Sequence, residues 1–298
     1  MSDSRNSIIV LGSSNTDMVV KTERFPKPGE TIVGGEFFLF AGGKGANQAV
    51  AAAKLGGAVQ FVARVGDDLF GRQAVAGFAA VGIDCQHVSV DPDNASGTAL
   101  ITVDASGENS IVVAPGANAA LLPEHLREVD FAVATLVLMQ LETPLETIGA
   151  VAKLAAGKCI LNPAPAQPLP DDLLNGLYLI TPNESETELL TGIDPTDPAS
   201  RARAAQAMHA KGVHNVIITL GSAGAYFSNG EGSFTVAAPK VKAVDTTAAG
   251  DTFNGALVVA LAEGMDWRTA IEFAVKAASI SVTRMGAQVS VPEREEVG

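Results

Sequence analysis

Cysteine and histidine are scarce in this sequence, and neither is arranged as a metal site. The 298 residues include only two cysteines, Cys85 and Cys159, which lie far apart and form no CxxC pair. We expect both to be small buried side chains, not a disulfide. The four histidines are scattered without an HxH or HExxH pattern, so the sequence gives no signal for a histidine-based metal centre.

Long apolar runs and basic patches are missing as well. No apolar run approaches the roughly 20 residues that span a bilayer, and residues 1–7 lack the features of a signal peptide. We therefore expect a soluble, cytoplasmic protein that does not bind membranes. The 20 Lys and Arg against 33 Asp and Glu give a formal net charge of -13, so we expect no nucleic-acid partner. Such an acidic chain must bind anions through local groups such as helix amides, one lysine or a divalent ion.

Strand and helix patterns alternate along most of the chain. Short apolar runs predict strands over residues 7–12, 58–66, 131–142, 158–166, 177–183 and 215–221. Between and after them, amphipathic or Ala-rich stretches predict helices over 47–56, 70–82, 144–157, 184–192, 198–212, 250–264 and 266–286. This order predicts an α/β fold, a three-layer αβα (Rossmann-like) arrangement with a mostly parallel central sheet. Ligands are expected at the carboxyl ends of its strands.

Two segments interrupt the alternation. Residues 18–40 are extended and punctuated by Pro and Gly, and residues 97–116 resemble a hairpin that turns at 105–109. We expect a small β-sheet lid over 14–41 and 94–115, and a main domain over 1–13, 42–93 and 116–298. Such a sheet must cover the active site or the same sheet of a second subunit. The alternative is that these strands extend the edge of the main sheet.

The segment VDTTAAGDTFNGAL, residues 244–257, places small residues directly before an acid and an apolar helix. Backbone N–H groups of Ala248, Ala249 and Gly250 could approach a phosphate at the start of that helix. Asp251 would then be a base for a sugar hydroxyl. Alternatively, Asp251 is only the N-cap or first-turn acid of the helix.

Polar side chains suited to a sugar follow several predicted strands. AGGKGANQA, residues 41–49, supplies Gly42, Gly43, Lys44 and Asn47 but matches neither GxxxxGK[ST] nor GxGxxG. Its glycines would let a polar ligand touch the backbone, although a plain glycine turn before a helix is the alternative. Three further acceptors follow strands and could equally be caps or turn residues, namely Asn15, Asp17 and Glu142.

Two more strand ends suit a nucleotide with its metal. Asn183 and Glu186 in ITPNESE offer oxygen ligands for a hydrated Mg²⁺, but the same spacing fits the N-cap and N3 positions of a helix. ITLGSAG, residues 218–224, is a predicted strand that ends in a glycine turn, as expected where a nucleotide crosses a strand end.

Taken in order, these segments resemble the ribokinase branch of the PfkB sugar kinase family. AGGKGANQA is similar to its first signature and DTTAAGDTFNGA to its second. The similarity continues through GSSNTD, FPKPGET, MQLE, NPAPA, ITPNESE, ITLGS and RMGAQVSVP. It implies ATP-dependent phosphorylation of D-ribose at its 5-hydroxyl and a homodimer formed through the lid.

The resemblance also implies a role for each matching position. Asp251 would be the base, and Ala249 and Gly250 would form an anion hole. The sugar would be held by Asn15, Asp17, Gly42, Gly43, Lys44, Asn47, Glu142 and Asp251. The nucleotide side would comprise Asn183, Thr219, Leu220, Gly221, Ser222, Gly224 and Gly250, with Glu186 acting on Mg²⁺ through water. A monovalent cation, usually K⁺, would lie near Asp245, Thr247, Ser281, Arg284, Gly286 and Ser290, several of them through backbone carbonyls.

Three other functions compete with this one. A kinase for 2-deoxyribose or another sugar would share most of these positions. A non-catalytic sugar-sensing protein of the same fold is disfavoured by the intact Asp251 and the anion-hole segment. A nicotinamide-dependent oxidoreductase is disfavoured because GxGxxG is absent after the first strand.

Overall fold

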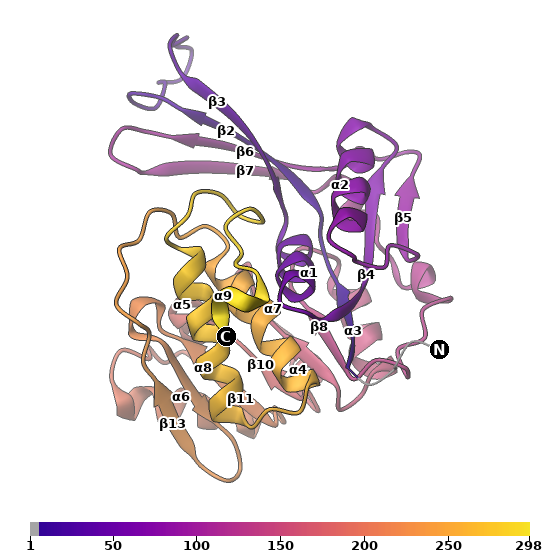
Figure 1. The fold of residues 1–298 in the computed structure, drawn as a ribbon, viewed down its shortest axis with the longest axis vertical. Coiled ribbons are helices and arrows are strands. Elements are labelled where there is room, and N and C mark those ends of the chain that lie inside the picture. The colour runs from indigo at the N-terminus through magenta and orange to yellow at the C-terminus, as the bar shows by residue number, and fades with distance from the viewer. Residues whose placement is uncertain (1–5) are drawn as a thin grey trace.

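A nine-stranded sheet forms the centre of the protein (Figure 1). The computed structural model describes residues 6–298, so the first five residues of the predicted 1–13 segment lie outside it. From one edge to the other the sheet runs β13 (Ser233–Val236), β12 (Ala225–Ser228), β11 (Asn215–Thr219), β10 (Leu179–Ile180), β9 (Cys159–Leu161), β8 (Leu136–Met139), β1 (Ser7–Leu11), β4 (Ala58–Gly66) and β5 (Val88–Asp91). The strands from β5 to β11 are parallel, and only β12 and β13 pair antiparallel.

Helices cover both faces of this sheet, which confirms the predicted three-layer fold. Along β1, Ile8 and Val10 belong to one buried cluster and Ile9 and Leu11 to another, as the period of two in a strand requires. The first cluster packs against α1 (Lys44–Lys54), α2 (Leu69–Ala80), α7 (Ala249–Ala262) and α8 (Trp267–Ser281). The second packs against α3 (Leu145–Leu154), α4 (Asp171–Leu174), α5 (Glu184–Thr191) and α6 (Pro198–Ala210). The chain ends with α9 (Arg294–Val297).

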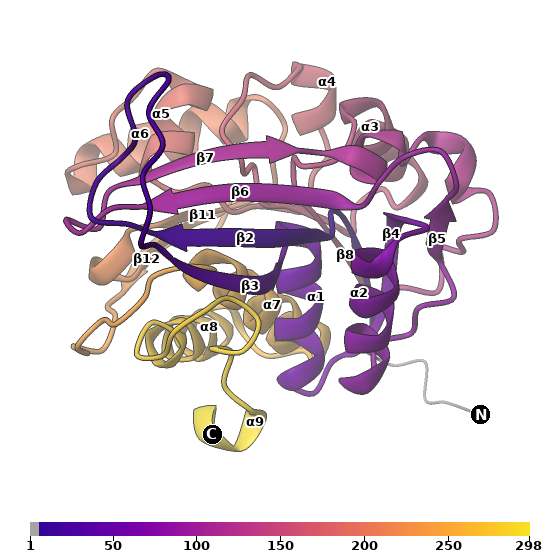
Figure 2. The same ribbon diagram turned by 90° about the horizontal axis from the view of Figure 1, so that it is seen from above.

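A separate four-stranded sheet lies across one end of the main body, as Figures 1 and 2 show. Its order is β3 (Glu36–Gly42), β2 (Asn15–Lys21), β6 (Gly97–Val103) and β7 (Asn109–Ala114). The prediction of a separate small sheet is confirmed, and the alternative of strands added to the main sheet is wrong. The proposed domain limits at residues 14–41 and 94–115 stay predictions.

Some local predictions differ from the structure. The strand predicted over 131–142 is limited to β8, because Phe131 and Ala134 are buried by packing without joining the ladder. The hairpin of β12 and β13 and the short strand β5 were not predicted. Cys159 is buried as expected, but Cys85 is only partly buried. Within residues 6–298, no helix is long and apolar enough to cross a membrane.

Candidate active site

Two helices from opposite ends of the chain cross at Gly255 and bring the predicted base to the glycine-rich segment. A Cβ on Gly255 would lie 2.5 Å from Ala51 Cβ and 2.8 Å from the Gln48 carbonyl oxygen, so only glycine permits this approach of α7 to α1. One turn earlier on α7, Asp251 is buried, with 6% of its surface exposed. Its Oδ2 accepts from Asn47 Nδ2 at 3.0 Å and its Oδ1 from Gln48 Nε2 at 2.9 Å.

The electrostatic surroundings of Asp251 suit a base. Burial raises the pKa of Asp251, while Lys44 and the amides of Asn47 and Gln48 act in the opposite direction. A carboxylate whose pKa is raised towards neutrality accepts a proton more readily than an ordinary surface carboxylate. The Asp251 side chain is therefore held as an acceptor in a site with little water.

The start of α7 lacks a side-chain cap. Its N-cap residue is Ala248, which adopts a left-handed backbone conformation with φ 58° and ψ 16° and provides no capping hydrogen bond. Asp251 lies in the first turn but is not the N-cap, and its carboxylate binds α1. The Ala249 N–H donates to the Thr246 carbonyl at 3.2 Å. Because the first N–H groups of a helix have no intrahelical acceptor, the exposed Gly250 side of this turn suits an anion.

The glycine turn before α1 has close backbone contacts. Gly43 is the N-cap of α1 with φ 87°, and a Cβ on Gly42 would lie 2.2 Å from the Asp17 carboxylate. Burial, with the nearby Glu142 and Asp251, raises the pKa of Asp17 to about 6. The turn therefore brings the Asp17 carboxylate against bare backbone, where a side chain would displace it.

Lys44 provides the cation for a cluster of carboxylates. Burial lowers its pKa, but Asp251, Glu142, Glu186 and Asp17 outweigh burial, so the pKa of Lys44 is raised. The lysine therefore stays protonated. It is the local positive charge that an anion would need in a chain of net charge -13.

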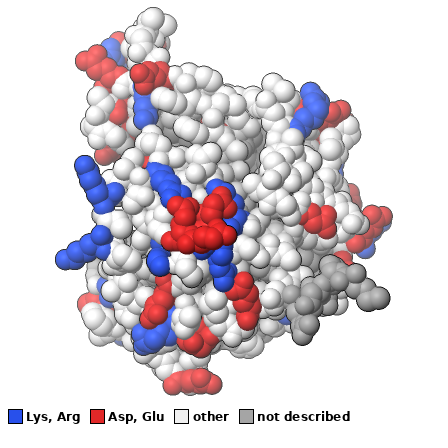
Figure 3. Space-filling view, in the orientation of Figure 1, with Lys and Arg blue, Asp and Glu red and all other residues white. Residues whose placement is uncertain are grey.

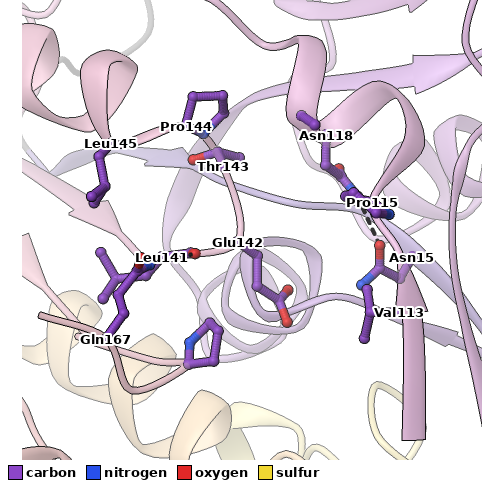
Figure 4. A pocket seen from close by; sticks show the side chains of 12 residues that line it. Asn15, Val113, Pro115, Asn118, Leu141, Glu142, Thr143, Pro144, Leu145 and Gln167 are labelled. Carbon is purple, nitrogen blue, oxygen red and sulfur yellow. Dashed lines mark hydrogen bonds between the residues drawn. The ribbon is translucent and has the colours of Figure 1, made fainter.

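A pocket of about 450 Å³ opens beside this cluster (Figure 4). Glu142 points into it, and Glu142 Oε2 accepts from the Ser13 hydroxyl at 2.5 Å and from the Lys44 N–H at 2.9 Å. Asn15 lines the pocket, and its Oδ1 accepts from Asn118 Nδ2 at 2.7 Å. The small sheet contributes Val113, so it covers part of the site. Asp251 is not among the residues that line this pocket.

The predicted nucleotide side follows β10 and β11. Asn183 caps α5, and the alternative of a capping box with Glu186 is confirmed. Asn183 Oδ1 accepts from the Glu186 N–H, and Glu186 Oε2 accepts from the Asn183 N–H, both at 2.8 Å. Burial raises the pKa of Glu186. Because Glu186 Oε2 serves the cap, Oε1 is the oxygen that could face a hydrated metal. The capping box and a metal role are thus compatible.

The second nucleotide segment is the turn after β11. The Thr219 N–H donates to the Pro182 carbonyl at 2.9 Å, which joins this turn to the Asn183 loop. Leu220, Gly221, Ser222 and Gly224 form the turn, and Gly221 and Gly224 have φ 52° and 101°. The structure thus brings the two predicted nucleotide segments together.

The predicted cation residues come from two loops. Asp245 Oδ1 accepts from the Thr247 N–H and Oδ2 from the Gly286 N–H, each at 2.9 Å, which joins the 245–247 loop to the segment after α8. Burial opposes ionisation here, but the hydrogen bonds from Thr247 and Gly286 outweigh it and lower the pKa of Asp245. A carboxylate held ionised between two loops fits a monovalent cation.

The remaining predicted cation residues have side-chain partners of their own. The hydroxyls of Ser281 and Ser290 donate to the carbonyls of Ala278 and Ala287. The Arg284 side chain pairs with Glu296 of α9. Figure 3 shows acidic and basic side chains gathered at the middle of the face that it draws. Arg284 is therefore suited to a cation only through its backbone carbonyl, whereas the Ser281 and Ser290 hydroxyl oxygens keep lone pairs that could coordinate one.

Sequence reasoning missed several buried polar residues of the site. Ser13 and Asn118 orient Glu142 and Asn15, and Gln48 binds Asp251 directly. Gln48 could have been found from its position next to Asn47 in a helix that faces the base. Ser13 and Asn118 carried no local signal.

Comparisons with known proteins show what the whole chain is similar to. Residues 5–294 match the pfkB family of carbohydrate kinases. A ribokinase of Haemophilus influenzae is 47% identical over 297 residues, covering 98% of this chain and 97% of the relative. A deoxyribokinase of Salmonella typhi is 38% identical and covers 97% of this chain and 96% of the relative. The structure of Arabidopsis thaliana ribokinase complexed with ribose and ATP superposes with a TM-score of 0.92 at 35% identity, covering 97% of this chain and 96% of that one.

Proposed function

The chain belongs to the pfkB family of carbohydrate kinases, and from this premise we propose that it uses ATP to phosphorylate D-ribose at the 5-hydroxyl, giving D-ribose 5-phosphate. The single observation that supports this most is the buried Asp251 carboxylate at the uncapped start of α7, beside the sugar-type ligands of α1. Ribokinases similar over nearly the whole chain support ribose as the sugar. The reaction would take place in the cytoplasm, where ATP is available.

In the proposed reaction, Asp251 accepts the proton of the sugar 5-hydroxyl while that oxygen forms a bond to the γ-phosphorus of ATP and the bond to ADP breaks. The base must lie beside the anion hole, because the oxygen that it deprotonates becomes bonded to the phosphorus bound there. The Gly250 N–H would stabilise the charge on the transferring group. The Ala249 N–H, which donates to the Thr246 carbonyl in this structure, would have to turn from that acceptor to join it. Lys44 adds a positive charge nearby.

The sugar hydroxyls would be held by donors and acceptors around the glycine turn. Asp17 and Glu142 provide carboxylates, Asn15 and Asn47 provide amides, and Gly42 and Gly43 would contact the sugar through their backbone. Asn47 Nδ2 already binds Asp251, so the same amide could contact sugar and base together.

Two ions would assist the reaction. Glu186 and Asn183 would hold Mg²⁺ through water, and the ion would neutralise phosphate charge. Oε1 of the buried Glu186, which takes no part in the capping box, would fit this role. The backbone around Asp245, Thr247 and Gly286 would hold K⁺, which would order the anion-hole loop that begins three residues after Asp245.

The small sheet would act as a lid and form a homodimer. Four large apolar side chains that share one face of it by their strand pairing are 45–64% exposed, namely Phe37, Leu39, Leu100 and Val112. An exposed apolar face of this kind calls for a partner, and the same face of a second copy would supply one.

A related activity is the second candidate. A deoxyribokinase is 38% identical to this chain, so 2-deoxyribose is an alternative substrate. A panel of pentoses, deoxypentoses, hexoses and nucleosides, assayed for ADP release with ATP and Mg²⁺ in potassium buffer, separates these possibilities. We expect the highest kcat/KM with ribose. A higher kcat/KM with 2-deoxyribose would make that sugar the substrate in place of ribose. No turnover with any sugar would favour a non-catalytic sensor.

A further inference from the structure

Gln48 is a completely buried amide with every hydrogen-bonding group in use but one lone pair. It lies on α1 with 0% of its surface exposed. Its two N–H groups donate to Asp251 Oδ1 and to Asn162 Oδ1, both at 2.9 Å. Its Oε1 accepts from Gln140 Nε2 at 2.6 Å. The amide is therefore fixed with its nitrogen towards Asp251 and its oxygen towards Gln140.

Gln140 holds the Gln48 amide in this orientation, and its own side-chain oxygen is then left without a hydrogen bond within residues 6–298. Gln140 is also fully buried. Its oxygen, Oε1, lies against Gly12, where a Cβ would come within 2.1 Å of it. Turning the Gln140 amide round would aim oxygen at the oxygen of Gln48. An unsatisfied buried acceptor is unfavourable, so its presence indicates a requirement for the orientation of Gln48.

The same chain of hydrogen bonds extends to the first turn of α7. Asn162 Nδ2 donates to the Thr181 carbonyl at 3.1 Å, and the Thr181 hydroxyl donates to Asn254 Oδ1 at 2.6 Å. Asn254 Nδ2 then donates to the Gly250 carbonyl at 2.8 Å. One buried network, with Gln48 at its branch point, therefore contacts both the carboxylate and the backbone beside the anion hole.

We infer that Gln48 is a positioning residue, which holds the Asp251 carboxylate ionised and directed at the sugar hydroxyl. The inference rests on the proposed function. The other donor to Asp251 is Asn47, which is also expected to contact the sugar and so is not reserved for the base. Gln48 has no access to a ligand, and a flipped Gln48 would aim oxygen at the carboxylate. It therefore acts only through Asp251.

The test is the pH profile of kcat for Gln48→Leu, a variant of similar volume without the donor. A hydrogen bond to an ionised carboxylate favours the ionised form, so losing it raises the pKa of Asp251. We expect the acid limb of kcat to move upward by about one pH unit and kcat at neutral pH to fall about 10-fold. The Kd for ribose, measured by calorimetry without ATP, should change less than about 3-fold, because Gln48 does not contact the sugar.

Asn162→Leu is the matched control. It removes a buried amide from the same network and leaves the Gln48 contact to Asp251 in place. We expect it to lower the melting temperature but to keep the acid limb of the unmodified chain. If it moves the limb as far as Gln48→Leu does, Gln48 has only a structural role and the inference is overturned.

Gln48→Glu provides a second variant that keeps the shape of the side chain. It places a carboxyl group against Asp251, so the acid limb should move upward at least as far as in Gln48→Leu. An unmoved limb in whichever variant folds overturns the inference. Failure of the proposed function would look different, because the unmodified chain would then phosphorylate no sugar in the panel.

Discussion

Asn47 and Asp251 are 204 residues apart in the sequence, yet Asn47 Nδ2 donates to Asp251 Oδ2 at 3.0 Å. The contact joins the helix that follows the glycine turn to the helix that carries the proposed base. It is possible because Gly255 lets α7 pass close to Gln48 and Ala51 of α1. A sugar held by Asn47 would thereby lie beside the carboxylate that we propose takes its proton.

Asp251→Asn should remove the base and keep the sugar site. We expect kcat to fall at least about 100-fold, the scale on which loss of a general base is usually felt. Ribose binding, measured by calorimetry, should persist because the other proposed sugar ligands are unchanged. A variant that turns over at the normal rate would refute the assignment of Asp251.

Gly255→Ala should disturb the crossing of the two helices. Its Cβ would meet Ala51 Cβ at 2.5 Å and backbone atoms of α1 at 2.8 and 2.9 Å, so the helices must separate. We expect a loss of about 1–3 kcal/mol in the free energy of unfolding, measured by denaturant titration, and a fall in kcat.

Gly149→Ala is the control for the helix crossing. Gly149 lies inside α3, and a Cβ there would meet nothing within 4 Å. Alanine at this position should stabilise the helix by roughly 0.5–1 kcal/mol and leave kcat unchanged. Equal effects of the two substitutions would count against a role for the crossing.

The activity should depend on potassium through the loop of Asp245. We expect a higher rate in potassium than in sodium chloride at equal ionic strength, because the larger ion suits the backbone carbonyls that we propose as its ligands. Asp245→Ala should weaken the activation, since it removes the carboxylate that ties Thr247 to Gly286. Glu231→Ala, in an exposed turn, is the control and should keep the activation by potassium. Identical rates in the two salts would contradict the cation site.

The parts of the fold that the sequence predicted are those set by local patterns. Buried parallel strands such as Ser7–Leu11 are continuous apolar runs, and α7 and α8 are long apolar or amphipathic segments, so composition alone reveals them. The strand β8 was predicted too long, because in a sequence an apolar residue that is buried outside the strand, such as Phe131, cannot be told from one that is buried within it. Separating the two requires knowing which backbone groups pair, and that depends on distant residues.

The candidate site shows the same limit. Asp251, Asn47 and the glycine turn lie in segments whose residue types already suit sugar and phosphate. Gln48 could have been suspected from its place beside Asn47, but its contacts depend on packing, because Asp251, Gln140 and Asn162 lie 203, 92 and 114 residues from it. An amide in an Ala-rich helix acquires its role from the fold, not from its neighbours in sequence.

Asp17 should make the ligand-free protein less stable as the pH rises. Its pKa is raised from 3.8 to about 6 by burial and by the carboxylates of Glu142 and Asp251. Below pH 3.8 the group is protonated in both folded and unfolded chains and costs nothing. Between pH 3.8 and about 6 the unfolded chain releases the proton first, so the free energy of unfolding falls as the pH rises. Above about pH 6 the loss of folding free energy that Asp17 causes is constant, at most about 3 kcal/mol.

Asp17→Asn should therefore raise the free energy of unfolding at pH 8 and have little effect near pH 4, while it weakens ribose binding. Asp91→Asn is a control of opposite sign, because the Arg64 guanidinium holds the pKa of the buried Asp91 carboxyl well below its usual range. Stability from Asp91 is present above the unfolded pKa, so this variant should lose stability at pH 8. Denaturant titrations of both variants at the two pH values measure the difference. If Asp17→Asn is no more stable than the unmodified chain at pH 8, the Asp17 carboxylate is not strained by its neighbours, and its position against Gly42 would need another explanation.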